Sequence, residues 1–89
     1  MNQVKKAVHY WCKDTLSGKY QGQGVGVAVL DTGIVMHDDF YGRVRKFYDA
    51  VSYIDKIYDD NGHGTHVSGI VGGSGKLSGE QYSGMAPAC

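Results

Sequence analysis

Residues 25–30 (Val-Gly-Val-Ala-Val-Leu) form an apolar run that ends at the polar triplet Asp-Thr-Gly of residues 31–33. A run with no polar alternation is typical of a strand covered on both faces, as in the parallel sheets of α/β proteins. Open sheets of this kind place their functional groups at the carboxyl ends of central strands. The run therefore predicts an α/β fold with a central parallel strand over 25–30 and a functional site that begins at Asp31.

Other segments suggest helices and a second strand. Residues 3–16 carry apolar side chains at helical spacing, and Asn2 is available as a cap. The members are Val4, Ala7, Val8, Trp11, Cys12 and Leu16. We expect residues 1–18 to form a leading amphipathic helix that Gly18 ends. Residues 43–51 are a weaker strand candidate.

The segment after residue 58 is rich in turn-forming residues. A short helix is expected to start near His63, with Val67, Ile70 and Val71 on its buried face. Residues 72–84 are rich in Gly and Ser, which predicts a flexible surface loop. Residues 85–89 resemble the approach to a further strand.

Length and charge limit the classes of function. The chain has 89 residues, fourteen of them glycine, which is enough for one small domain at most and suggests an incomplete one. Nine basic residues balance nine acidic ones, so nucleic acid and an anionic membrane are not expected as partners. The longest apolar run is far too short to span a bilayer.

The two cysteines, Cys12 and Cys89, lie near opposite ends of the chain and predict neither a metal knuckle nor a disulfide framework. Lys5 and Lys6 are followed by only two apolar residues before His9, so the apolar core of a secretory signal is missing. The sequence on this basis predicts a cytoplasmic location, if Met1 is the natural start.

Two motifs carry the chemistry. Residues 27–34 read Val-Ala-Val-Leu-Asp-Thr-Gly-Ile, and residues 59–69 read Asp-Asp-Asn-Gly-His-Gly-Thr-His-Val-Ser-Gly. In this order they resemble the first two active-site motifs of the subtilisin-like serine proteases, and most closely those of intracellular bacterial members. Residues 82–87 (Tyr-Ser-Gly-Met-Ala-Pro) also resemble a segment of that family. The similarity extends over roughly residues 20–88.

The resemblance implies a three-layer α/β fold with a mostly parallel sheet flanked by helices. Residues 1–89 would be the N-terminal part of one catalytic domain, with residues 19–89 holding the Asp-motif strand, the His-motif helix and the following loop. It also implies that Asp31 and His63 are catalytic. A serine hydroxyl needs an imidazole to take its proton, and a carboxylate fixes the tautomer of that imidazole. The positive end of the helix at His63 should keep the imidazole neutral.

The family's nucleophile motif, Gly-Thr-Ser-Met-Ala-x-Pro, does not occur in residues 1–89. Ser83 precedes Gly-Met-Ala-Pro, but the inserted Gly84 breaks the pattern. The oxyanion-hole asparagine of relatives also lies downstream. We therefore expect the chain to be inactive alone, with the missing C-terminal part of the domain and a peptide or protein substrate as its partners.

Metal sites are weaker hypotheses. His63 and His66 are three residues apart and His37 could join them, but the glutamate of a His-Glu-x-x-His zinc motif is absent. We expect His66 to be a packed helix residue. Asp39 occupies the position of a calcium-ligating aspartate in some relatives, yet no other ligand is identifiable, and a solvated turn carboxylate is favoured. No cofactor is expected for the chemistry.

Two alternatives stay open on the sequence. Residues 29–33 (Val-Leu-Asp-Thr-Gly) also fit a small homodimeric aspartic protease, in which two chains pair their aspartates. That interpretation leaves the His-Gly-Thr-His segment of residues 63–66 unexplained. The other alternative is a non-catalytic relative that serves as a binding module. A Gly-Thr-Ser motif in a longer reading frame would separate these hypotheses.

Overall fold

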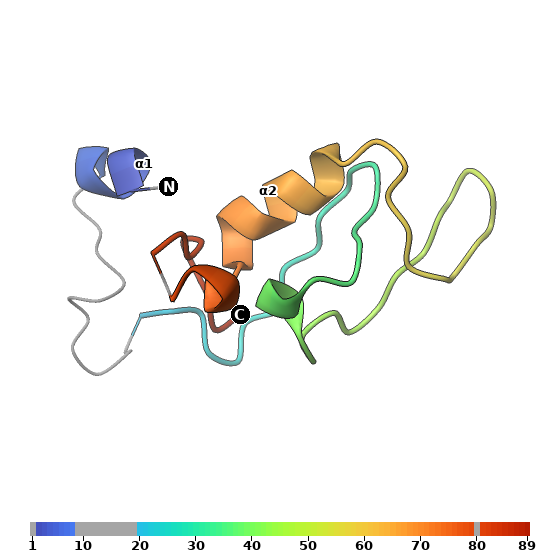
Figure 1. The fold of residues 1–89 in the computed structure, drawn as a ribbon. Coiled ribbons are helices and arrows are strands. Elements are labelled where there is room, and N and C mark those ends of the chain that lie inside the picture. The colour runs from blue at the N-terminus through green and yellow to red at the C-terminus, as the bar shows by residue number, and fades with distance from the viewer. Residues whose placement is uncertain (1, 9–19, 80) are drawn as a thin grey trace.

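The computed structural model describes residues 2–8, 20–79 and 81–89. Two α-helices, α1 (Asn2–Ala7) and α2 (His63–Gly72), and two short 3-10 helices, η1 (Asp38–Phe40) and η2 (Lys76–Ser78), follow in chain order. Figure 1 shows α2 in the middle of the fold, with the extended segments and the 3-10 helices around it. The fold thus centres on the helix that begins at His63.

α1 covers only the start of the predicted leading helix. It begins at Asn2 itself, so the predicted cap is the first helical residue. The rest of that prediction, including Trp11, Cys12 and Gly18, falls on residues 9–19, outside the described part. Within the described residues, α1 is held to the far end of the chain by Lys5, whose Nζ donates to the carbonyl and hydroxyl oxygens of Ser83 at 2.7 and 3.1 Å.

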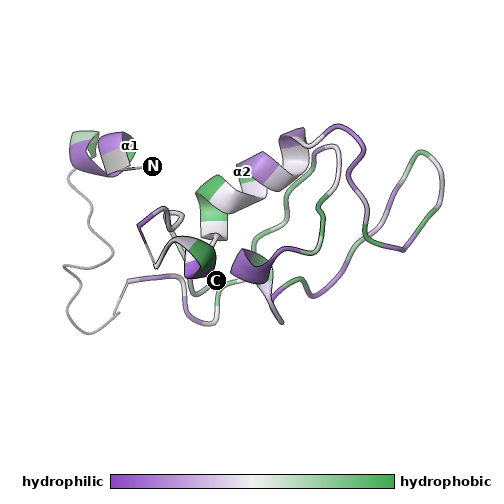
Figure 2. Ribbon diagram, in the orientation of Figure 1, coloured by the Kyte–Doolittle hydropathy of each residue, from purple (hydrophilic) through white to green (hydrophobic). Residues whose placement is uncertain are grey.

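The strand predicted over 25–30 is not formed. The described residues contain no strand, and Asp49 and Ile54 make the one isolated antiparallel bridge among them. Val25 is 57% exposed and Leu30 is 93% exposed, and Figure 2 shows apolar residues along the extended segments. A strand needs hydrogen-bonding neighbours, and no neighbouring strand lies beside this run in the described residues.

The weaker strand candidate, residues 43–51, is also wrong for this structure. The Asp49–Ile54 bridge closes a tight loop, and the Asp49 carboxylate accepts from the amides of Val51 and Ser52 at 2.8 and 3.0 Å. Tyr53 completes the turn with φ of 55°. The end of this segment is therefore a loop fixed by an aspartate side chain and not part of a sheet.

The helix near His63 is confirmed, but its predicted buried face is not. Ile70 is 37% exposed, Val67 and Val71 are half-buried, and the buried residues of α2 are Gly64 and Gly72. The buried apolar side chain among the described residues is Phe40 in η1, at 7% exposure, whose ring lies against Gly69. Glycines let other backbone segments approach the helix closely, and this replaces an interdigitated side-chain core.

The two ends of the Gly- and Ser-rich segment of residues 72–84 are packed, whereas Lys76, Leu77 and Tyr82 between them are exposed, as a surface loop predicts. The amides of Gly84, Met85 and Ala86 donate to carbonyls at the end of α2 and at Gly73, at 2.8 to 2.9 Å. A Cβ on Gly84 would meet the carbonyl oxygen of Gly69 at 2.5 Å. Small residues here allow one backbone segment to pack directly against another. Composition alone does not distinguish this use of glycine from its use in flexible loops.

Candidate active site

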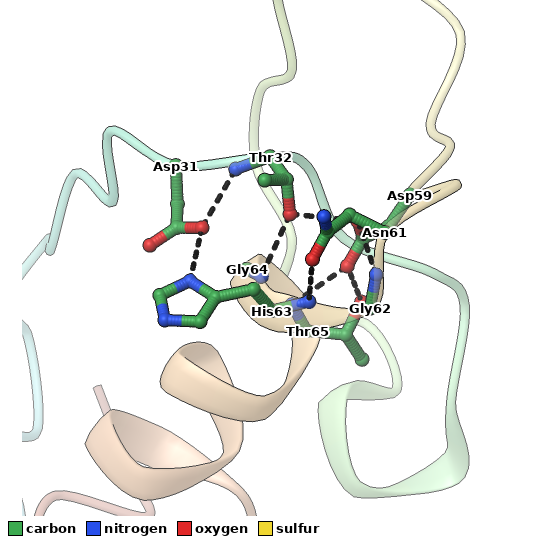
Figure 3. Close-up of polar contacts among 8 residues, drawn as sticks. All are labelled: Asp31, Thr32, Asp59, Asn61, Gly62, His63, Gly64 and Thr65. Carbon is green, nitrogen blue, oxygen red and sulfur yellow. Dashed lines mark hydrogen bonds and ion pairs between the residues drawn. The ribbon is translucent and has the colours of Figure 1, made fainter.

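Asp31 and His63 face each other at the start of α2. Asp31 Oδ1 lies 2.7 Å from His63 Nδ1, and Figure 3 shows the carboxylate directed at the ring. The resemblance to the subtilisin-like proteases predicts hydrogen-bond contact between these two side chains, and the geometry confirms it. The Asp31 side chain is only 15% exposed, whereas that of His63 is 63% exposed. The pair therefore has a sheltered carboxylate and an accessible imidazole.

Hydrogen bonding and charge shift the pKa values of both members of the pair. The hydrogen bond to Asp31, helped by the Asp31 charge, raises the pKa of His63 above its ordinary value. The same hydrogen bond, together with the amide of Thr32, lowers the pKa of Asp31. The carboxylate of Asp31 therefore favours the charged form of the ring. Asp31 stabilises an imidazolium at this position.

The residue after the aspartate orients it. The Thr32 amide donates to Asp31 Oδ1 at 2.7 Å. The Thr32 side chain turns the other way, so that Oγ1 donates to Asp59 Oδ1 at 2.8 Å and accepts from the Gly64 amide at 2.9 Å. One residue thereby connects the carboxylate of Asp31 to the first turn of α2.

Two glycines bring the Asp and His motifs together. A Cβ on Gly64 would lie 2.2 Å from the carbonyl oxygen of Gly33, so no side chain fits there. Gly33 has φ of 132°, and a Cβ on it would stand 2.0 Å from the carbonyl oxygen of Tyr58. Gly64 thus lets the backbone of the Asp motif touch the helix.

Asp59, Thr32 and Thr65 were not among the sequence-predicted site residues. Asp59 Oδ1 accepts from the Gly62 amide at 2.9 Å, and Oδ2 accepts from the Thr65 amide at 2.9 Å. The Thr65 hydroxyl also donates to Asp59, and this bond is the largest cause of a pKa that lies well below the ordinary value for Asp59. The two amide bonds lower the pKa further. An aspartate just before a helix start is a capping signal that could have indicated Asp59.

His37 and His66, the other histidines among the described residues, are both exposed. His66 is exposed, so its predicted packed position is wrong. His37 Nδ1 accepts from the Asp39 amide at 3.1 Å, and Asp39 Oδ1 accepts from the Leu77 amide at 3.4 Å. The described residues hold no cluster of three His, Cys, Asp or Glu side chains that could bind a metal ion. In the same residues, no helix is long and apolar enough to cross a membrane.

The chain is similar in sequence to a family of known proteins. The model of the Subtilase family matches residues 22–89. Serine protease AprX of Bacillus subtilis (strain 168) is 54% identical over 66 residues, which cover 74% of this chain and 15% of that protein. The minor extracellular protease Epr of the same strain is 47% identical over 66 residues, covering 74% of this chain and 10% of Epr.

An extracellular serine proteinase of Thermus sp. (strain Rt41A) is 47% identical over 64 residues, covering 66% of this chain and 16% of that protein. The chain thus spans between 10% and 16% of the length of these three relatives.

Proposed function

This chain belongs to the subtilase family, and we propose that the protein containing it is a serine-type endopeptidase. In this proposal Asp31 and His63 are two members of an Asp-His-Ser triad. The acyl group of a peptide bond is transferred to the serine and then to water. The family implies the α/β subtilisin fold. Its sheet would be completed by sequence outside residues 1–89.

The observation that carries the proposal is the 2.7 Å contact between Asp31 Oδ1 and His63 Nδ1. With the Nδ1 proton donated to Asp31, Nε2 is the nitrogen available as a base. His63 is exposed enough for a hydroxyl group to approach it. As Nε2 accepts the serine proton, the ring becomes an imidazolium that the adjacent carboxylate stabilises.

The nucleophilic serine and the oxyanion-hole asparagine are proposed to lie outside residues 1–89. Ser83 is unsuited to the nucleophile's role because it is only 6% exposed and its hydroxyl accepts from Lys5. Its flanking segment is also tied to the end of α2 through Gly84 and Met85. The chain alone should therefore not hydrolyse peptides, and the rest of the domain and a peptide or protein substrate are its proposed partners.

Family membership overturns the alternative of a small homodimeric aspartic protease. The partner of Asp31 is accordingly an imidazole and not a second aspartate. No cofactor takes part in the proposed reaction. The predicted cytoplasmic location stays a prediction, and two of the relatives above carry the word extracellular in their names.

The proposal is tested on the whole protein with a fluorogenic peptide substrate and the variants Asp31→Ala and His63→Ala. Each variant should lose nearly all hydrolysis while remaining folded by circular dichroism. His66→Ala, at an exposed position of the same helix, is the matched control and should keep full activity. A folded wild-type protein without hydrolysis would favour the non-catalytic binding module.

A further inference from the structure

Asp59 makes more contacts around the Asp31–His63 pair than a helix cap requires. Its Oδ1 accepts from Thr32 Oγ1 at 2.8 Å and from the Gly62 amide at 2.9 Å. Its Oδ2 accepts from the amide and from the hydroxyl of Thr65, at 2.9 and 2.5 Å. Both carboxylate oxygens are thus occupied twice, by donors on both sides of the site (Figure 3).

The two threonine hydroxyls extend these contacts. A hydroxyl has one proton to donate and two lone pairs that accept. Because each threonine gives its proton to Asp59, its lone pairs are free for a backbone amide. Thr32 Oγ1 accepts from Gly64 at 2.9 Å, and Thr65 Oγ1 accepts from Val35 at 3.1 Å. By taking the hydroxyl protons, Asp59 therefore orients two hydrogen-bonded cross-links with α2, one at Thr32 of the Asp motif and one at Val35 just after it.

The cross-link through Thr32 reaches the Asp31–His63 pair. Thr32 binds Asp59 through its hydroxyl and Asp31 through its amide, at 2.8 and 2.7 Å. Gly62 and Gly64, which flank His63, are bound by Asp59 and by Thr32 respectively. We propose that Asp59 is a positioning residue that fixes the carboxylate of Asp31 against the ring of His63 through Thr32. The inference rests on the proposed peptidase function.

A purely capping role for Asp59 predicts a different effect of substitutions at Thr32. A cap stabilises α2 through the amides of Gly62 and Thr65, and it needs nothing from the hydroxyl of Thr32. A positioning role does need that hydroxyl, because it is the contact that reaches the Asp31 side of the site. Small displacements of reacting groups lower turnover strongly and affect ground-state binding less. The charge of Asp59 also adds to the raised pKa of His63.

The experiment measures kcat and KM of the whole protein on a peptide substrate for wild type, Asp59→Asn, Thr32→Val and Thr32→Ser. Asp59→Asn and Thr32→Val should each lower kcat about tenfold or more with KM within about twofold. Thr32→Ser keeps the hydroxyl and should restore most of the activity. Asp59→Asn should also move the acid limb of the kcat/KM profile to lower pH. Asp60→Asn, at the exposed neighbouring carboxylate, should match wild type.

Thr32→Val keeps the inference testable if Asp59→Asn fails to fold. An active wild type with full kcat in Thr32→Val would overturn the positioning role and leave the peptidase proposal standing. Equal losses in Thr32→Val and Thr32→Ser would overturn it as well. A folded wild type that cleaves no peptide would overturn both proposals.

Discussion

The carbonyl oxygen of Gly33 occupies the space where a side chain on Gly64 would begin, 2.2 Å from an ideal Cβ. The two residues come from the Asp motif and from the first turn of α2. Their contact brings the backbones together so that Asp31 reaches His63 without any intervening side chain. Backbone contact at this point is therefore a condition for the geometry of the pair.

Gly64→Ala should accordingly abolish most of the activity of the whole protein. The added methyl group must push Gly33 away, and the Asp31–His63 contact should lengthen with it. We expect kcat to fall by about a hundredfold. His66→Ala, at an exposed position of the same helix, is the control. The kcat of both variants is measured by peptide hydrolysis. Normal turnover in Gly64→Ala would contradict the close contact between Gly33 and Gly64.

Asp31→Asn should change both the rate and its pH dependence. In the proposed mechanism the base is neutral His63, so kcat/KM should rise with pH through the pKa of His63, which Asp31 raises above its ordinary value. Loss of the carboxylate removes the main cause of that increase, so the midpoint should move to lower pH. The kcat of Asp31→Asn should be about four orders of magnitude below that of wild type, an effect taken from the corresponding residue of another subtilase.

The measurement is a pH–rate profile of wild type and Asp31→Asn, with the exposed Asp55→Asn as control. An unchanged midpoint in Asp31→Asn, or a midpoint at higher pH, would show that the carboxylate does not support the charged ring.

Arg43 joins three segments through backbone carbonyls. Its guanidinium donates to the carbonyl oxygens of Asp39, Gly72, Pro87 and Cys89. Arg43→Met should lower the free energy of unfolding of the whole protein by about 2 kcal/mol, because bonds to a charged donor are lost and half-buried acceptors lose their partner. Urea denaturation gives the value. Arg45→Met, two residues later and exposed, should change it little.

The sequence predicted the contact between Asp31 and His63 better than it predicted the fold. Asp31 and His63 were found because their motifs have a distinctive order, and the start of α2 was found because His63 follows a turn. The strand over 25–30 was predicted from its composition, but pairing depends on neighbours, and the described residues supply none beside it. Asp59 was overlooked because its role lies in long-range bonds to Thr32, which no local pattern displays.

The exposed apolar residues of 25–30 lead to a prediction about residues 1–89 alone. Val25, Val27 and Leu30 lie open to solvent as an extended, unpaired segment. Such a segment favours association through its edge and its apolar side chains. Residues 1–89, expressed alone, should therefore associate or remain partly unfolded, as judged by a urea melt combined with sizing. A sharp two-state transition from a compact monomer would contradict this.

The central claim is that His63, held by Asp31, activates a serine that lies outside residues 1–89. Fluorophosphonate labelling of the whole protein, followed by peptide mapping, tests it most directly. We predict one labelled serine, located beyond residue 89, and loss of nearly all labelling in His63→Ala. Residues 1–89 alone should take up no label. Labelling of Ser83, or labelling that His63→Ala leaves unchanged, would contradict the account.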